Sequence, residues 1–206
     1  INKRMEAESG TVAIAWHSQG FRFITNSKQP ISTLAELAPV KIRTPNNPIM
    51  IGVYRAWGTD PVPMAMDETF NALQQKVVDG QDNPLVSIAT NRFYEVQKYF
   101  TEVNYQFHPD PFYVNAAWWN GLPEEYRDII TECATKMGEY NDELIDKNSS
   151  AAKQTIVDSG CEVYEPSADE LKAFQTAVQS VYDQCVTEGI CTADEIKEMQ
   201  DIVAKA

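Results

Sequence analysis

The sequence lacks long apolar runs and is short of positive charge. No stretch of about eighteen apolar residues occurs, so we expect no transmembrane helix and no direct insertion into a membrane. Seventeen lysines and arginines stand against thirty aspartates and glutamates, which gives a net charge of −13. Nucleic-acid binding depends on cationic contacts with phosphates, so this balance argues against nucleic acid as a partner.

Sequence signatures of catalysis are also missing. The chain has no G-x-S-x-G elbow, no H-E-x-x-H, no glycine loop for phosphates and no dinucleotide fingerprint. Asp67 and Glu68 form an acidic pair, but adjacent residues on a helix point apart, so these two carboxylates do not easily act on one substrate atom. The two histidines, His17 and His108, are far apart in the sequence, and a structural zinc site needs four ligands. We therefore expect no enzyme, no cofactor and no metal site.

The four cysteines give one close pair. Cys185 and Cys191 lie in C-V-T-E-G-I-C, where Gly189 lets the chain turn back. We predict a Cys185–Cys191 disulfide in an oxidising compartment; the alternative is two free thiols that pack between helices. Pairing of Cys133 with Cys161 stays open.

The first residue is Ile1, and no basic, apolar leader precedes it. If the protein is exported, we expect its signal peptide to have been removed.

Hydrophobic periodicity predicts alternating strands and helices. In the first half, two short strands on either side of a turn at H-S-Q-G form a hairpin, and V-K-I-R is a strand that Pro45 stops. A helix at 48–57, a strand at D-P-V-P-M and a helix from Asp67 to Val78 follow. Gly80 ends that helix and Pro84 starts the next, which runs through R-F-Y-E-V-Q-K-Y.

The second half continues the alternation. A strand at D-P-F-Y-V-N-A-A-W precedes one long helix over 122–150, a strand at C-E-V-Y and two helices. Each of these two helices opens with a capping box, Ser167 with Glu170 and Thr192 with Glu195. The pattern predicts an α/β fold with a largely parallel or mixed sheet.

Positive charge gathers in one region. Residues 11–64 carry Arg22, Lys28, Lys41, Arg43 and Arg55 against only Glu36 and Asp60. Arg43 ends a predicted strand, and Asn83 stands at a predicted helix start, so both groups can face one anion. An acid is the ligand that this arrangement favours.

Five strings, in this order, carry a family resemblance: K-I-R-T-P-N-N, G-T-D-P-V-P-M, N-A-L-Q-Q-K-V-V-D-G-Q-D-N-P, F-Y-E-V-Q-K-Y and W-W-N-G-L-P-E-E-Y-R-D-I-I. They resemble the DctP-type solute receptors of tripartite ATP-independent periplasmic (TRAP) transporters, from about Gly20 to Lys147. Two features depart from the family. Ala38-Pro39 replaces the usual glycine before K-I-R, and the family's opening segment, which supplies much of the first lobe, is absent.

The resemblance implies a periplasmic-binding-protein-like architecture with two lobes, mixed sheets and long helices. Residues 1–206 would be the C-terminal two-thirds of such a receptor. Within it, 20–115 would form the core of the ligand-binding lobe, 122–150 a long connecting helix, and 151–206 the C-terminal strand and helices.

The resemblance also assigns site residues. Arg43 would fix the ligand carboxylate, since a guanidinium matches a carboxylate bidentately; a structural salt bridge is the alternative. Asn83 would be the second carboxylate contact, although the residues alone suit a helix N-cap before Pro84. Arg22 matches an arginine of some family members and otherwise is an exposed strand residue. Asn46 and Met66 are further pocket candidates or ordinary loop and core residues.

The implied function is capture of a small organic acid in the periplasm and its delivery to TRAP membrane permease subunits for ion-coupled uptake. A periplasmic ligand-sensing module would use the same pocket, and an enzyme acting on a small acid is the remaining alternative. The sequence does not identify the acid.

Overall fold

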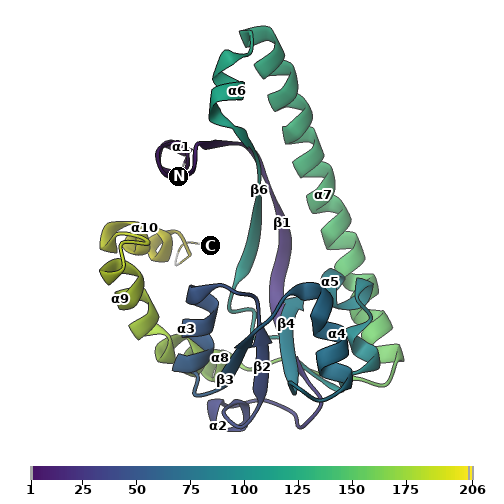
Figure 1. Cartoon of the computed structure of the whole chain (residues 1–206). Coiled ribbons are helices and arrows are strands. Elements are labelled where there is room, and N and C mark those ends of the chain that lie inside the picture. Colours follow the sequence, from purple (N-terminus) through teal and green to yellow (C-terminus); the bar gives the residue numbers. More distant parts are fainter. Residues whose placement is uncertain (1, 204, 206) are drawn as a thin grey trace.

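One mixed sheet organises the chain, of which the computed structural model describes residues 2–203 and 205 (Figure 1). The strand order is β3-β2-β4-β1-β5-β7, with β6 paired to β1 outside this row. β2 runs parallel to β3 and β4, and β5 parallel to β7, whereas β1 is antiparallel to β4, β5 and β6. The strands are β1 (Thr11–Asn26), β2 (Lys41–Thr44), β3 (Asp60–Pro63), β4 (Gly80–Pro84), β5 (Tyr99–Thr101), β6 (Phe107–Asn115) and β7 (Glu162–Tyr164). The predicted α/β fold with a mixed sheet and long helices is confirmed.

Helices cover both faces of the sheet. They are α1 (Asn2–Ser9), α2 (Leu34–Leu37), α3 (Pro48–Ala56), α4 (Met66–Gln74), α5 (Leu85–Thr90), the 3-10 helix η1 (Phe93–Glu95), α6 (Ala116–Gly121), α7 (Glu124–Asp158), α8 (Ala168–Ala177), α9 (Gln179–Thr187) and α10 (Ala193–Val203). The long helix α7 was predicted over 122–150 and continues beyond Ser150 to Asp158.

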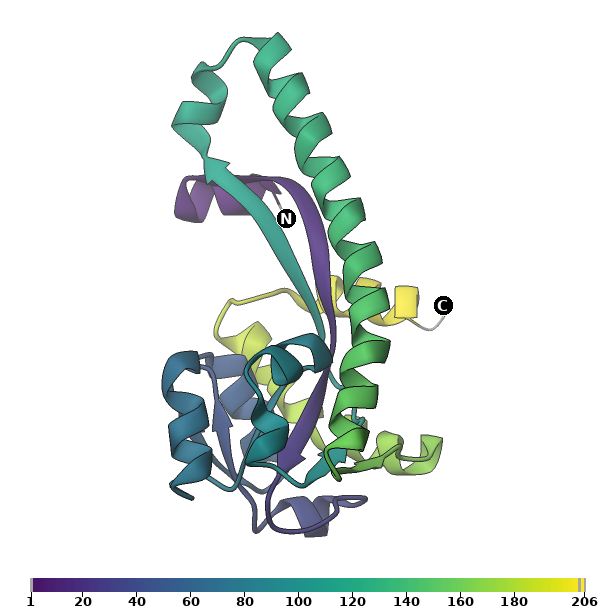
Figure 2. The ribbon, with the colours of Figure 1, turned by 90° about the vertical axis from the view of Figure 1, so that its right-hand side faces the viewer.

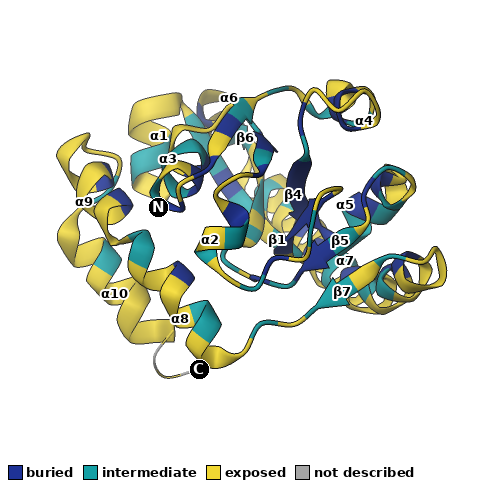
Figure 3. Ribbon diagram, turned by 90° about the horizontal axis from the view of Figure 1, so that it is seen from below, coloured by how far each residue is buried: buried dark blue, intermediate teal, exposed yellow. Residues whose placement is uncertain are grey.

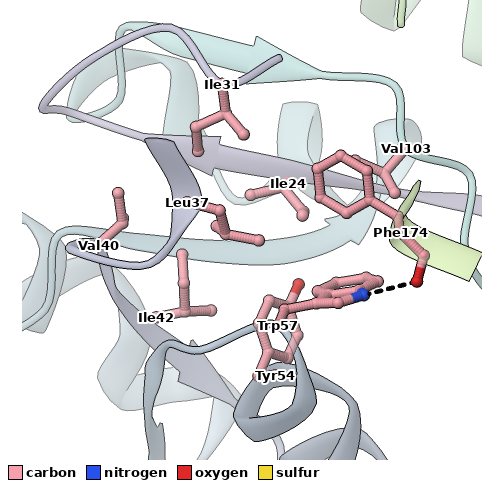
Figure 4. Packing of buried hydrophobic residues seen from close by; sticks show 9 residues of the cluster. All are labelled: Ile24, Ile31, Leu37, Val40, Ile42, Tyr54, Trp57, Val103 and Phe174. Atoms are coloured by element: carbon pink, nitrogen blue, oxygen red, sulfur yellow. Dashed lines mark hydrogen bonds between the residues drawn. The ribbon is translucent and has the colours of Figure 1, made fainter. Parts of the chain in front are cut away.

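Two apolar clusters pack on opposite faces of the sheet, because successive strand residues point to opposite sides. On β1, Ile24 belongs to the first cluster, with the rings of Tyr54, Trp57 and Phe174 (Figure 4). Its neighbour Phe23 belongs to the second, formed with α4, α5, η1 and the end of α7. The Nε1 atom of Trp57 donates a 3.0 Å hydrogen bond to the carbonyl of Phe174, which ties α8 to α3.

A long two-stranded ribbon of β1 and β6 rises from this body, and α7 runs along it (Figures 1 and 2). The helix comes very close at Gly138, where a Cβ atom would lie 2.7 Å from the carbonyl oxygen of Trp16. Asn141 and Asp142 of α7 bond the backbone of Ser18, at 3.0 Å to its carbonyl and 2.8 Å from its amide. The ribbon and the helix therefore form one unit.

The predicted hairpin at the start of the chain is wrong. β1 is a single strand of 16 residues, and the expected turn at H-S-Q-G is an irregularity within it. Its register against β6 shifts between Ser18 and Phe21, with Gly20 at a φ of 81°. A bulge uses the same small and polar residues as a turn, but it only bends the strand locally and does not reverse the chain.

The segment that we predicted as a helix boundary at Gly80 and Pro84 is instead the buried strand β4 (Figure 3). Helix α4 ends earlier, at Gln74, and α5 follows β4 with no side-chain cap from Asn83. Gly80 is required because a Cβ atom there would lie 2.2 Å from the carbonyl oxygen of Thr25 on β1. Close packing between two neighbouring strands, and not a helix end, explains this glycine.

Both predicted capping boxes are present near the C-terminal end. The hydroxyl of Ser167 accepts from the amide of Glu170, whose carboxylate accepts from the amide of Ser167. Thr192 and Glu195 repeat the exchange at the start of α10. Three helices follow β7 where two were predicted, because Val178 separates α8 from α9.

The predicted Cys185–Cys191 disulfide is wrong: all four cysteines are described, and each is free. Gly189 does turn the chain back, at a φ of 70°. The turn brings the amides of Ile190 and Cys191 to the carbonyl of Cys185, at 2.9 and 3.4 Å, and leaves the sulfur atoms unbonded. Burial, followed by the neighbouring Cys191, raises the pKa of the Cys185 thiol.

Within the described ranges, none of the helices combines the length and the apolar character needed to span a membrane.

Candidate ligand-binding site

Arg43 on β2 is a buried arginine with no carboxylate partner in the described part of the chain. Its side chain is held from one side, because Nε and Nη2 both donate to the carbonyl oxygen of Met64, at 3.0 and 2.6 Å. The residue is only 3% exposed. A guanidinium has further N–H groups, so the Nη1 end of Arg43 remains available to a planar anion.

Arg22 on β1 lies in a different environment. Its Nε donates to Oδ2 of Asp82 at 2.7 Å, and its Nη2 donates to the Asp82 carbonyl at 2.7 Å. Both side chains are buried, so this is an internal ion pair. Although burial disfavours the charge, the attraction and hydrogen bond of Asp82 raise the pKa of Arg22. The structural salt bridge considered for Arg43 is thus made by Arg22.

Tyr105 bonds the same carboxylate oxygen of Asp82 as the Nε atom of Arg22. Its hydroxyl donates to Oδ2 of Asp82 at 2.6 Å, and its ring packs edge-on against Tyr54 and Trp57. Burial, followed by the charge of Asp82, raises the pKa of Tyr105 well above its ordinary value, so the hydroxyl keeps its proton. The Asp82 carboxylate therefore accepts hydrogen bonds from one charged donor, Arg22, and from one neutral donor, Tyr105.

The charges in this region do not balance. Arg22 and Asp82 cancel, whereas Arg43 retains a buried positive charge. Burial lowers the pKa of Arg43, with repulsion from Arg22 acting in the same direction and attraction to Asp82 opposing both. A buried charge without a partner costs several kcal/mol, so the arrangement favours an anion beside Arg43.

Asn83 on β4 lies next to this charge in the sheet, because Arg43 pairs with Gln81 in register and Asn83 bonds Gln81. The Oδ1 atom of Asn83 accepts from Nη2 of Arg22 at 3.3 Å. Its Nδ2 atom lies 3.7 Å from Sδ of Met66, the first residue of α4. Arg43, Arg22, Asn83 and Met66 therefore gather around the ends of β2 and β4.

Asn46 is separate from this group. It is exposed in the bend between β2 and α3, and its side chain makes no hydrogen bond within the described residues. Its neighbour Asn47 is the N-cap of α3 and accepts from the amides of Ile49 and Met50.

His108 on β6 extends the ion pair toward the ribbon. Its Nδ1 lies 3.0 Å from Nη1 of Arg22 and must accept there, because a guanidinium only donates. The proton then sits on Nε2, 3.4 Å from Oδ1 of Asp110. Burial, and then the charge of Arg22, lower the pKa of His108, so the ring is neutral near neutral pH.

Sequence reasoning missed Asp82, Tyr105 and the contact of His108. Asp82 stands between two amides in D-G-Q-D-N-P, and a carboxylate flanked in this way on a buried segment was an available signal. Tyr105 and His108 carry no comparable signal, because their contacts depend on the pairing of β1 with β4 and β6.

A cavity in the structure lies away from these residues. It has a volume of about 450 Å³ between α3 and α9, and Arg55 is the charged residue in its lining. None of the predicted site residues lines it. Among the described residues, no cluster of histidine, cysteine or acidic side chains is arranged to hold a metal ion.

Comparison with known proteins gives a family and several relatives. The family model for bacterial extracellular solute-binding protein, family 7 (DctP), matches residues 1–188. The 2,3-diketo-L-gulonate-binding periplasmic protein YiaO of Escherichia coli (strain K12) is 28% identical over 194 residues, which cover 94% of this chain and 58% of that protein.

Two solved structures resemble the fold closely. A TRAP periplasmic solute-binding protein of Chromohalobacter salexigens with bound d-glucuronate has a TM-score of 0.89 at 29% identity, covering 95% of this chain and 64% of that one. The sugar acid binding protein DctPAm of Advenella mimigardefordensis, in complex with galactonate, has a TM-score of 0.88 at 28% identity, covering 99% and 65%. This chain thus spans less than two thirds of the length of each of these relatives. It belongs to the DctP family of bacterial extracellular solute-binding proteins.

Proposed function

We propose that the protein is a periplasmic receptor that binds a small organic acid through its carboxylate and delivers it to TRAP membrane permease subunits. One observation carries this proposal: the buried guanidinium of Arg43 has no carboxylate partner among the described residues. A ligand carboxylate would supply the missing negative charge and accept from the free Nη1 end. Met64 already fixes the plane of the guanidinium, so less side-chain freedom is lost on binding.

The relatives support the same chemistry. The Chromohalobacter protein was solved with d-glucuronate, the Advenella protein with galactonate, and YiaO is named for 2,3-diketo-L-gulonate. All three are sugar-derived acids with one carboxylate. We therefore propose a sugar acid or a similar hydroxy acid as the substrate class.

The supporting contacts have different roles in this proposal. Asn83 is the second carboxylate contact, and Met66 forms an apolar wall beside it. Arg22 acts beside the ligand while remaining paired with Asp82. Asn46, which is exposed, would reach the ligand only if the loop between β2 and α3 moves toward it.

We further propose that the site is completed by a second lobe, with the β1–β6 ribbon and α7 connecting the two. Closure would exclude water and strengthen each charged hydrogen bond.

The test compares ligands that differ only in the carboxylate. The complete protein is titrated calorimetrically with D-glucuronate and D-galactonate, and with galactitol, in which a CH₂OH group replaces the carboxylate of galactonate. We expect a sugar acid to bind and galactitol to bind at least about a hundredfold more weakly, since a charged pair is lost from a buried site. Equal affinity for galactonate and galactitol would contradict carboxylate recognition.

A second experiment tests the alternative that the protein is an enzyme. The acid that binds is incubated with the protein, and its NMR spectrum is followed over time. A receptor returns the acid unchanged, whereas steady conversion would establish catalysis.

A further inference from the structure

A chain of buried polar side chains runs behind Asn83, on the face of the sheet that Arg43 also occupies. Gln97, Thr25, Gln81 and Asn83 are bonded one to the next, and none is more than 7% exposed. Thr25 pairs with Gln81 across β1 and β4, and Gln81 pairs with Arg43 across β4 and β2.

Which group donates and which accepts in each of these hydrogen bonds is fixed by the end of the series farthest from Asn83, at Gln97. There the carboxamide of Gln97 meets two backbone carbonyls, those of Val96 at 2.9 Å and Asp79 at 3.3 Å. Carbonyl oxygens only accept, so the amide nitrogen of Gln97 must face them and its oxygen must face Thr25.

The remaining bonds then have only one arrangement. The hydroxyl of Thr25 has one proton, which it donates to Oε1 of Gln97 at 2.9 Å. It can therefore only accept from Nε2 of Gln81, also at 2.9 Å. This leaves Oε1 of Gln81 facing Asn83, whose Nδ2 donates to it at 2.5 Å.

The orientation of Asn83 is fixed as a result. Its Oδ1 faces Nη2 of Arg22, which can only donate. The contact at Oδ1 therefore requires the same orientation of the carboxamide as the contact at Nδ2. One Nδ2 proton is used by Gln81, and the other points at the sulfur of Met66, a weak acceptor that a ligand oxygen can replace.

We infer that Gln97, Thr25 and Gln81 are positioning residues that hold Asn83 as a hydrogen-bond donor toward the ligand. This inference rests on the proposed function. It adds a selection rule: the ligand atom that Asn83 meets is an acceptor, such as a carboxylate or carbonyl oxygen, and a donor group at that point is rejected because Asn83 cannot rotate to accept.

Thr25 offers the sharpest test, with Thr44 as the matched control. Both threonines are fully buried in neighbouring parts of the sheet, but Oγ1 of Thr44 has no hydrogen-bond partner within the described ranges. Thr25→Val breaks the chain at its centre, Thr25→Ser keeps the hydroxyl, and Thr44→Val removes a hydroxyl that bonds nothing.

Each variant of the complete protein is titrated with D-glucuronate and D-galactonate, with thermal melts alongside. We expect Thr25→Val to weaken binding roughly three- to tenfold, the loss expected when one intermediate hydrogen bond no longer positions a contact. Thr25→Ser should restore most of the affinity, and Thr44→Val should stay within about twofold of the unaltered protein. Unchanged affinity in Thr25→Val, or equal losses in the Val and Ser variants, would overturn the inference.

A measurement on the unaltered protein keeps the inference testable if Thr25→Val does not fold. The side-chain amide protons of Gln81 and Gln97 should exchange with solvent far more slowly than those of Gln74, which is exposed on α4. Exchange as fast as that of Gln74 would overturn the proposed series of hydrogen bonds.

The titrations distinguish failure of the proposed function from failure of this inference. If the unaltered protein binds no acid, the proposed function is overturned, and the selection rule with it. If the unaltered protein binds normally and Thr25→Val is unaffected, only the inference is overturned.

Discussion

The Nε atom of Arg22 lies 2.7 Å from Oδ2 of Asp82, and neither side chain is more than 3% exposed. This pair separates the two arginines of the candidate site. Arg22 already has its counter-charge, whereas Arg43, held by the carbonyl of Met64, does not. The ligand's negative charge is therefore expected at Arg43, and Arg22 stabilises the strands that carry the site.

Asp82→Asn tests the ion pair. It keeps the shape of the side chain and leaves Arg22 buried without a counter-charge, so we expect a loss of about 3–5 kcal/mol in the free energy of unfolding. Urea denaturation measures it. A loss below about 1 kcal/mol would mean that the pair is solvated like a surface salt bridge.

Two tyrosines in one cluster provide a second test. Tyr105→Phe removes a hydroxyl that donates to the Asp82 carboxylate, and the expected cost is about 1.5–3 kcal/mol. Tyr54→Phe removes a buried hydroxyl with no hydrogen-bond partner in the described structure, so it should be neutral or slightly stabilising. Thermal and urea unfolding measure the change in the free energy of unfolding in both variants. Equal changes would contradict the hydrogen bond from Tyr105 to Asp82.

Gly80→Ala tests the tight approach of β4 to β1. The added methyl group would lie 2.2 Å from the carbonyl oxygen of Thr25 and 2.9 Å from Cδ1 of Ile42, so the strands must separate. We expect destabilisation of about 1–3 kcal/mol or more. As a control, Gly121→Ala has open space around the new methyl group and should change stability little.

Stability should also depend on pH through His108. The groups that face this ring are Arg22 and His17 on β1, Asp82 on β4 and Asp110 on β6. Its pKa is lowered in the folded protein from an ordinary value of 6.5, so the unfolded chain binds the proton more readily. The contribution of His108 to stability is therefore complete above pH 6.5 and declines as the pH falls below 6.5 toward the folded pKa.

His108→Gln checks this dependence, because glutamine retains an acceptor for Arg22 but does not titrate. The free energy of unfolding, measured between pH 8 and pH 5, should fall less steeply below pH 6.5 in the variant than in the unaltered protein. Parallel profiles would exclude His108 as the titrating group.

Much of the fold follows from local patterns, and the exceptions have physical causes. The strand that carries Arg43, the capping boxes and the long helix were predictable from periodicity and cap residues. β4 was not, because G-Q-D-N-P contains no β-branched or aromatic residue. It is a strand because it lies between β1 and β2, and pairing with both outweighs its low propensity.

The site divides in the same way. Arg43 was predictable as a strand-end cation, and its position on the sheet follows from the short strand itself. The partnership of Arg22 was not, since it depends on the register that sets Arg22 opposite Pro84 and thereby places Asp82 on the same face. The orientation of Asn83 depends on three other residues from three segments, Thr25, Gln81 and Gln97, and no local pattern contains that information.

The central claim is that Arg43 binds the ligand's carboxylate, and calorimetric titration of the complete protein with D-glucuronate and D-galactonate tests it most directly. Arg43→Lys keeps the charge but loses the planar fork, and Arg43→Ala loses both; Arg55→Lys, at an exposed arginine of α3, is the control. We predict that the lysine variant binds at least about tenfold more weakly, the alanine variant more weakly still, and the control as tightly as the unaltered protein. Unchanged affinity in a folded Arg43→Ala protein would contradict the account.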